Sequence, residues 1–170
     1  MMHKAVFFDR DGVLNHEIGN YVCKKEDFKV LDDSVACIKY AKENGFKVIV
    51  ITNQGGIDKG LYTAQDLAGF HQILQNACLE SGTIIDDFYY CKHHPVVGNC
   101  LCRKPDSIMI EKAIAKHQID KGQCFMIGDT DRDIDAATKA GIKSILIQPN
   151  QPKLHLIQEE IQKINNQKNH

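Results

Sequence analysis

Two carboxylates one residue apart follow the first apolar run of the chain. Residues 5–8 are all apolar, and Asp9, Arg10 and Asp11 come directly after them, just before a glycine. Because residues i and i+2 of an extended chain point to the same side, Asp9 and Asp11 can face one space at the end of a strand. Adjacent carboxylates repel each other unless a cation lies between them or one binds a proton. The pair indicates a hard metal ion, or a nucleophile beside an acid/base, or both; a solvated turn is the alternative.

Two further segments could bind an anion such as a phosphoryl group. After the apolar run 48–51, Thr52 offers a hydroxyl donor, and the glycines at 55 and 56 let backbone N–H groups approach a ligand. Arg103 and Lys104 are adjacent cations before an expected helix, where lysine supplies a point charge and arginine a bidentate fork. Taken singly, the alternatives are a capped turn for the first segment and a solvated basic turn for the second.

A fourth segment, 125–133, again runs from apolar residues into carboxylates. An EF-hand calcium loop is excluded, because its sixth position needs glycine and Ile134 stands there. Asp133 and Asp135 would lie on the first turn of a helix and could simply favour its dipole. Asp129, at the strand tip, is the better metal-ligand candidate.

Segment 91–102 has the residue types of a zinc site. Cys91 and His93 form one close pair of soft ligands, and Cys100 and Cys102 form another, which gives a Cys₃His set for a tetrahedral structural Zn²⁺. His94 could replace His93 as the nitrogen ligand, and buried free cysteines are the alternative to a metal. Seven cysteines, an odd number, argue against a disulfide framework. A zinc ion here would rigidify the loop that presents both cations.

Composition bounds the class of protein. A chain of 170 residues fits one domain, 1–170, and 43% hydrophobic with 25% charged residues is ordinary for a soluble protein. A net charge of −1 without a basic run argues against nucleic-acid binding, and no apolar stretch is long enough to cross a membrane. The start, Met-Met-His-Lys, leaves no room for a signal peptide before the first strand, so we expect a cytoplasmic protein.

Apolar runs alternate with amphipathic segments along the chain, which predicts an α/β fold with a mostly parallel sheet covered by helices on both faces. Strands are expected over 4–9, 47–52, 88–91, 124–128 and 144–147. Helices are expected over 33–44, 63–81, 106–117 and 132–140, with a terminal helix after residue 150. Asp32 or Asp33 is a candidate cap for the first helix and Thr63 for the second. The polar segment 14–30 is long for a βα loop and is expected to be a flap over the substrate.

In this order, the four motifs resemble those of haloacid dehalogenase (HAD) superfamily phosphatases. The resemblance implies a Rossmann-like HAD fold with a minimal cap, made of the flap and the zinc loop. It also implies that Asp9 attacks phosphorus and forms an aspartyl-phosphate, while Asp11 protonates the leaving oxygen and then activates water. Mg²⁺ would be held by Asp9, the Asp11 carbonyl and Asp129. The phosphoryl oxygens would be held by Thr52, the Asn53 amide and Lys104.

Within the superfamily, the Cys-x-His and Cys-x-Cys-Arg-Lys-Pro segments look like those of two groups. One comprises the D-glycero-D-manno-heptose 1,7-bisphosphate 7-phosphatases, which supply nucleotide-activated heptose for lipopolysaccharide or S-layer glycans. The other comprises the histidinol-phosphate phosphatases, whose zinc loop is closer in length to the six residues between His93 and Cys100. Asn15, Tyr21 and Tyr89 favour the heptose group.

The heptose resemblance implies a small phosphorylated sugar as substrate. It places the substrate contacts on Glu17, Asn20, Asn53, Gln54, Arg103 and Lys104. Arg103 suits the second anion of a bisphosphate. A monomer is expected. A nucleic-acid end-processing phosphatase and a non-catalytic zinc-stabilised interaction domain are the weaker alternatives, because there is no basic patch and no catalytic position is degenerate.

Overall fold

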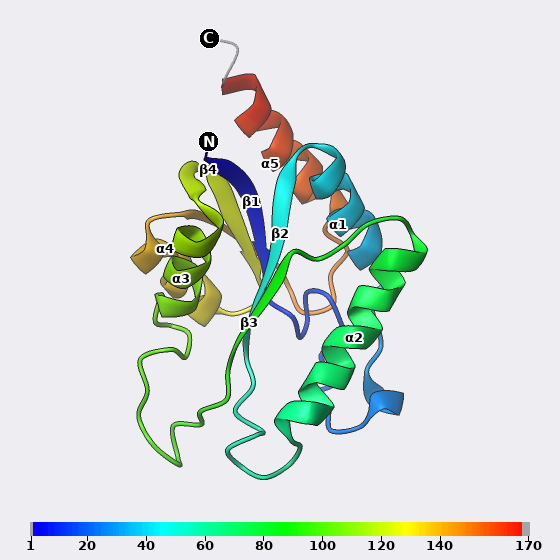
Figure 1. Ribbon diagram of the computed structural model, residues 1–170, viewed down its shortest axis with the longest axis vertical. Helices are drawn as coiled ribbons and strands as arrows, with labels where there is room; N and C mark the ends of the chain where they lie inside the picture. The colour runs from blue at the N-terminus through cyan, green and yellow to red at the C-terminus, as the bar shows by residue number, and fades with distance from the viewer. Residues whose placement is uncertain (1, 168–170) are drawn as a thin grey trace.

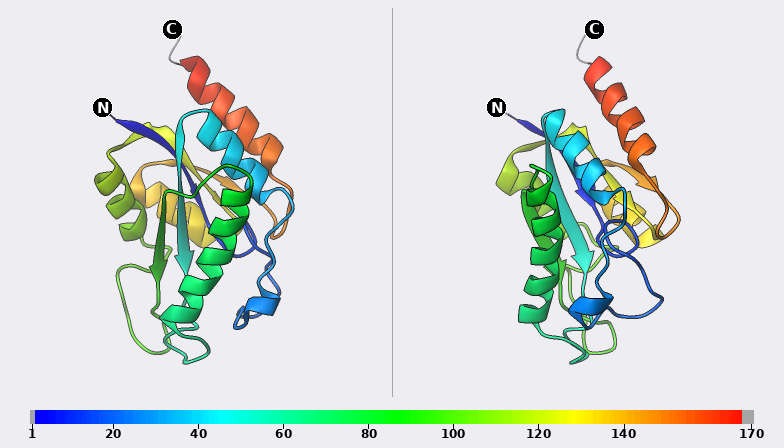
Figure 2. Two further views of the ribbon diagram at one scale, coloured as in Figure 1. Left: turned by 45° about the vertical axis from the view of Figure 1, so that its right-hand side comes forward. Right: turned by 90° about the vertical axis from the view of Figure 1, so that its right-hand side faces the viewer.

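The computed structural model describes residues 2–167, in which five parallel strands form one sheet between two layers of helices (Figures 1 and 2). The order across the sheet is β3-β2-β1-β4-β5. The strands are β1 (His3–Phe8), β2 (Phe46–Asn53), β3 (Asp87–Cys91), β4 (Ile119–Gly128) and β5 (Lys143–Leu146). The predicted parallel α/β fold is confirmed, although β4 begins five residues earlier than the apolar run indicated.

Alternation along the central strands builds a separate core on each face of the sheet. Val6 and Phe8 of β1 belong to one buried cluster, and Ala5 and Phe7 belong to the other. All four side chains are fully buried. A strand whose successive side chains are all apolar must be covered on both faces, which is why this sheet is a middle layer.

The helices divide between the two faces. α1 (Ser34–Glu43), α2 (Ala64–Glu80) and α5 (Leu154–Asn166) supply the cluster that contains Val6, whereas α3 (Ile108–His117) and α4 (Asp131–Ala140) supply the other (Figure 1). All five expected helices are present, with ends shifted by no more than two residues where bounds were predicted. None of the helices between residues 2 and 167 combines the length and apolar character needed to cross a membrane.

One of the two predicted helix caps is correct. Thr63 and Asp66 form a complete capping box at the start of α2. Asp33 occupies the N-cap position of α1 but makes no capping hydrogen bond. Its carboxylate instead accepts from the backbone N–H groups of Lys153 and Leu154, at 2.5 and 3.1 Å, so it ties the start of α5 to α1. That partner lies 120 residues away in the sequence, and no local pattern reveals it.

The strand order places the functional loops at one edge of the sheet. After β1 the chain forms β2 and then β3 on one side of it, and then crosses back to form β4 and β5 on the other side. Ligands bind outside the carboxyl ends of the strands at such a switch point, which here lies between β1 and β4. The predicted flap, 14–30, packs against α2 beside this edge, where Phe28 stacks on Phe70 with ring centroids 5.6 Å apart. Its only helical part is the 3₁₀ turn η1 (Lys25–Asp27).

Candidate active site

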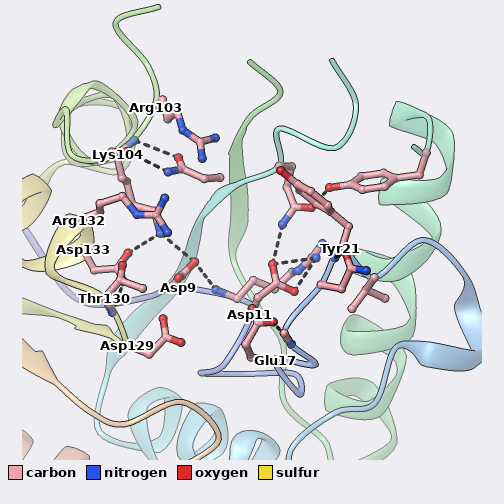
Figure 3. A pocket seen from close by; sticks show the side chains of 17 residues that line it. Asp9, Asp11, Glu17, Tyr21, Arg103, Lys104, Asp129, Thr130, Arg132 and Asp133 are labelled. Atoms are coloured by element: carbon pink, nitrogen blue, oxygen red, sulfur yellow. Dashed lines mark hydrogen bonds and ion pairs between the residues drawn. The ribbon is translucent and has the colours of Figure 1, made fainter. Parts of the chain in front are cut away.

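A cavity of about 350 Å³ opens at the carboxyl ends of β1, β2 and β4. Nearly all the residues singled out in the sequence line it (Figure 3). They are Asp9, Asp11, Glu17, Asn20, Asn53, Gln54, Arg103, Lys104 and Asp129. Thr52 is not among the lining residues; it is fully buried, and its hydroxyl accepts a hydrogen bond from Gln54.

Lys104 is the buried cation of the site. Its ammonium lies 2.8 Å from an Asp9 oxygen and 2.6 Å from an Asp133 oxygen, and it also donates to the Ile51 carbonyl (Figure 3). Burial by itself would lower the pKa of Lys104, but the two carboxylates outweigh burial and raise it. Lys104 therefore remains charged beside the candidate nucleophile.

Asp133 belongs to the site; the sequence analysis placed it in the fourth motif and offered a role with the helix dipole, but assigned it no role in the reaction. Its side chain is completely buried, and one oxygen accepts from the backbone N–H and the hydroxyl of Thr130. Thr130 and Asp133 form a capping box at the start of α4. A Thr-x-x-Asp pattern before an apolar helix is a recognisable sequence signal, but it identifies the cap rather than the ion pair with Lys104.

Three carboxylates form a group that fits a hard cation. Single oxygens of Asp9, Asp129 and Asp133 all lie within 4.8 Å of one another. Burial, opposed by Lys104 and reinforced by Asp133, raises the pKa of Asp9 to about 7. Burial and the charge of Asp133 raise the pKa of Asp129 to about 6. Such crowding of anions is relieved by a divalent metal with oxygen ligands.

Two glycines make room for these carboxylates. A Cβ on Gly12 would lie 2.1 Å from an Asp129 oxygen, and φ is +78° there. A Cβ on Gly128 would lie 2.2 Å from the Cβ of Asp133. Both positions need glycine because a carboxylate side chain lies too close for a Cβ atom. Gly12 also needs it because its φ is positive.

The Asp11 carboxylate is not part of the group formed by Asp9, Asp129 and Asp133. Arg10 donates to both of its oxygens at 2.9 and 3.0 Å, Asn15 donates to one and Gln54 to the other. Burial would raise the pKa of Asp11, but the charge of Arg10 and these hydrogen bonds lower it overall. Because Arg10, Asn15 and Gln54 bind the Asp11 carboxylate, Asp11 would contribute only its backbone carbonyl to a metal bound by Asp9, as the resemblance implied.

The two predicted amide contacts are bonded mainly within the protein. The Asn53 side chain donates to the Lys104 carbonyl and accepts from the Lys104 N–H, both at 3.0 Å. The Gln54 amide is shared among Asp11, Thr52 and Tyr62. Asn53 thus fixes the backbone that carries Lys104, while Gln54 reaches the candidate acid/base.

The Cys/His residues gather as the spacing predicted. Single ligand atoms of Cys91, His93, Cys100 and Cys102 lie within 4.8 Å of one another. The Sγ of Cys91 is 3.5 Å from that of Cys100 and 3.0 Å from that of Cys102. These separations approach the roughly 3.8 Å between sulfurs that both bind Zn²⁺ at about 2.3 Å in a tetrahedron. His94 is outside the group, since its Nδ1 accepts from the Val96 N–H.

The sequence analysis missed Arg132 and Tyr62. Arg132 is exposed on the first turn of α4, lines the cavity near Arg103, and has no ion pair among residues 2–167 (Figure 3). Tyr62 is buried behind Gln54. In the sequence, the position of Arg132 next to Asp133 could have indicated that it belongs to the site. No pattern in the sequence indicated Tyr62.

This site on this fold defines a phosphatase of the HAD class. A family model described as HAD-hydrolase-like matches residues 101–164. Among curated proteins, the D-glycero-beta-D-manno-heptose-1,7-bisphosphate 7-phosphatase of Helicobacter pylori is 42% identical over 146 residues, covering 85% of this chain and 83% of that protein. The D-glycero-D-manno-heptose-1,7-bisphosphate 7-phosphatase of Chlorobaculum tepidum is 37% identical, covering 85% and 78%.

A solved structure agrees. The D,D-heptose 1,7-bisphosphate phosphatase of B. bronchiseptica, complexed with magnesium and phosphate, superposes with a TM-score of 0.82 and 30% identity, covering 91% of this chain and 86% of that one. The chain belongs to the family of the heptose-1,7-bisphosphate 7-phosphatases, and it is a phosphoric monoester hydrolase.

Magnesium should stabilise the folded protein more at neutral than at acid pH. Because the pKa values of Asp9 and Asp129 are raised, the metal-free fold keeps protons that the unfolded chain has already released. Their contribution to stability is present below about pH 4 and is lost as the pH rises through about 6 to 7. Mg²⁺ binds the ionised carboxylates and offsets this loss.

Melting temperatures with and without saturating Mg²⁺, at about pH 5 and about pH 8, measure this difference. The rise produced by Mg²⁺ should be larger at the higher pH, and Asp129→Asn should reduce the pH dependence. Equal rises at both pH values would contradict the metal assignment.

Proposed function

We propose that the protein removes the 7-phosphate of D-glycero-D-manno-heptose 1,7-bisphosphate through an aspartyl-phosphate intermediate. The observation that carries this is Asp9 at the tip of β1, ion-paired to buried Lys104 and grouped with Asp129 in a cavity that also contains Arg103. The relatives of the chain in Helicobacter pylori and Chlorobaculum tepidum are named as 7-phosphatases of this bisphosphate. These relatives support the heptose bisphosphate, and not histidinol phosphate, as the substrate.

The residues divide the reaction between them. An Asp9 oxygen attacks phosphorus while the bond to the sugar oxygen breaks, and that oxygen takes a proton from Asp11. The pKa of Asp11, lowered by Arg10, must rise for this step, and the anionic phosphate that binds beside it acts in that direction. Asp11 then accepts a proton from water, whose oxygen attacks phosphorus and releases Asp9. Lys104 stabilises the charge on the transferring group. Asn53 fixes the backbone of Lys104, and Thr52, which is buried outside the cavity wall, supports Gln54. Mg²⁺, held by Asp9, Asp129 and the Asp11 carbonyl, supplies charge neutralisation.

We assign the second phosphate of the substrate to Arg103 and Arg132. Only three of the 21 basic residues are arginines, and all three line this cavity. Arg10 is bound to Asp11, whereas Arg103 and Arg132 lie at the cavity wall with guanidinium groups able to bind phosphate oxygens bidentately. Glu17 and Asn20, from the flap, are assigned to the sugar hydroxyls; Asn150 fixes Glu17 by two hydrogen bonds.

A structural Zn²⁺ on Cys91, His93, Cys100 and Cys102 is part of the proposal. Arg103 follows the last ligand directly, and its guanidinium donates to the His93 carbonyl at 3.1 Å. The metal would therefore fix the loop from which Arg103 reaches the cavity.

The remaining assignments concern the whole chain. We propose one HAD-like domain, with the flap 14–30 and the zinc loop 91–102 as its minimal cap. A monomer is part of this proposal. A cytoplasmic enzyme is supported by seven free cysteines, which fit a reducing compartment. Its product would serve the synthesis of nucleotide-activated heptose for lipopolysaccharide or S-layer glycan.

Phosphate release with Mg²⁺ tests the substrate. The heptose bisphosphate should be preferred over histidinol phosphate by a hundredfold or more in kcat/KM, or about 2.7 kcal/mol of transition-state discrimination. Asp9→Asn should abolish turnover of both while keeping the melting temperature within a few degrees. A preference for histidinol phosphate, or turnover by Asp9→Asn, would refute the proposal.

Loss of either outer arginine should weaken binding of the second phosphate. Arg132→Ala should raise KM for the bisphosphate about tenfold, or about 1.4 kcal/mol, with little change in KM for heptose 7-phosphate. Lys139→Ala removes an exposed cation from the same helix outside the cavity and is the matched control. If Arg132→Ala raises both KM values equally, the assignment to the second phosphate is wrong.

Zinc removal should act through Arg103. Cys100→Ser should lower the zinc content measured by atomic emission and raise KM for the bisphosphate, because Arg103 loses its fixed support. The parallel sheet should persist by circular dichroism, since Cys100 packs only at the margin of one core and serine is close to cysteine in size. Cys78→Ser, on α2, is the control. Full loss of zinc with an unchanged KM would remove this role from the loop.

A further inference from the structure

Tyr62 lines the cavity and is connected to the candidate acid/base through Gln54. It precedes the Thr63 cap of α2, is 6% exposed, and its hydroxyl donates to the Gln54 Oε1 at 2.5 Å. Phe70 packs edge-on to the Tyr62 ring, with centroids 6.0 Å apart. A Cβ on Gly56 would lie 2.3 Å from the same ring. The ring is therefore enclosed, and its hydroxyl has a fixed direction.

Gln54 connects Tyr62 to Asp11. Its Nε2 donates to an Asp11 oxygen and to the Thr52 hydroxyl, both at 2.8 Å. An amide has a donor end and an acceptor end, and the Tyr62 hydroxyl occupies the acceptor. Because Oε1 is engaged by Tyr62, Nε2 must face Asp11. Without the Tyr62 hydroxyl, the amide could rotate and turn its oxygen toward a carboxylate, which would push Asp11 away.

Asp11 is fixed from two directions. Arg10 and Asn15, from the segment that follows β1, bind it, and Gln54, which follows β2, binds it as well. Arg10 is itself buried, with its guanidinium carbon 5.4 Å from the centre of the Phe28 ring. Asp11 keeps a quarter of its side chain exposed, toward the cavity.

We propose that Tyr62 is a positioning residue for this reaction, which acts through Gln54 to hold the Asp11 carboxyl where it exchanges its proton. The inference rests on the proposed function. In the first step the bond from phosphorus to the leaving oxygen breaks, the bond from Asp9 to phosphorus forms, and the proton passes from Asp11 to the leaving oxygen. Gln54 thereby serves Asp11 rather than the sugar.

The test compares two leaving groups of nearly the same shape. Phenyl phosphate needs a proton on its departing oxygen, whereas p-nitrophenyl phosphate releases a stabilised anion that needs little help. We would measure kcat/KM, which reports the steps up to transfer onto Asp9, for the wild type, Tyr62→Phe, Gln54→Met and the double variant. Tyr40→Phe, on α1 away from the cavity, is the control.

Tyr62→Phe should lower kcat/KM for phenyl phosphate by a factor of ten or more and for p-nitrophenyl phosphate by less than about three. Gln54→Met should show the same selectivity, and the double variant should be no worse than Gln54→Met alone, because both act through one contact. Tyr40→Phe should match the wild type on both substrates. Melting temperatures verify that each variant is folded.

Equal losses on the two aryl phosphates, or additive losses in the double variant, would overturn the role of Tyr62 while leaving the phosphatase intact. If Tyr62→Phe does not fold, Gln54→Met still decides, since a loss without leaving-group selectivity refutes the contact. A wild-type protein that releases phosphate from neither aryl phosphate nor the heptose bisphosphate would instead refute the proposed function, and the inference with it.

Discussion

The confinement of like charges at one edge of the sheet is the constraint on which the site depends. Asp9, Asp129 and Asp133 are brought within 4.8 Å, and Asp133 has no contact with solvent. Among residues 2–167, the ammonium of Lys104 is the only cation that forms an ion pair with this group, and it pairs with Asp9 and Asp133. Breaking such a buried pair leaves an uncompensated charge, whereas adding a divalent ion completes the balance. The fold is therefore built for a site whose charges balance when a metal is bound.

Placing Lys104 requires parts of the chain that are distant in sequence. Its loop is clamped by Asn53 at the end of β2, and its ammonium is bound by the tips of β1 and α4. The parallel topology makes this possible, because all these strands end at the same edge. Gly12 and Gly128 complete the arrangement by letting backbone approach carboxylates more closely than any side chain would permit. The conformation of the active-site loops follows from this charge cluster as much as from local turn chemistry.

The sequence predicts what local patterns encode. Strand tips, the cap at Thr63, the alternating core of β1 and the cysteine spacing all follow from nearest neighbours, and the structure agrees with each. The partners of Asp33 and Asp133 could not be read in this way, because Lys153 and Lys104 reach them only once the sheet has formed. Asn53 and Gln54 were identified as polar residues near a ligand. Their hydrogen bonds to Lys104 and Asp11 could be assigned only from the geometry.

The arginines of the cavity differ in burial, and the proposal gives the buried and the exposed ones different roles. Arg10 is 1% exposed, and in such surroundings its attraction for Asp11 is weakly screened, so it controls one carboxylate at short range. Arg132 is exposed at the mouth, where water screens its charge and only a ligand with a dense negative charge can hold it firmly. In the proposed reaction, the same residue type would position the proton-transfer group inside the cavity and bind an anion outside it. At position 104 a lysine, with its compact point charge, suits the three acceptors that converge on it from different directions.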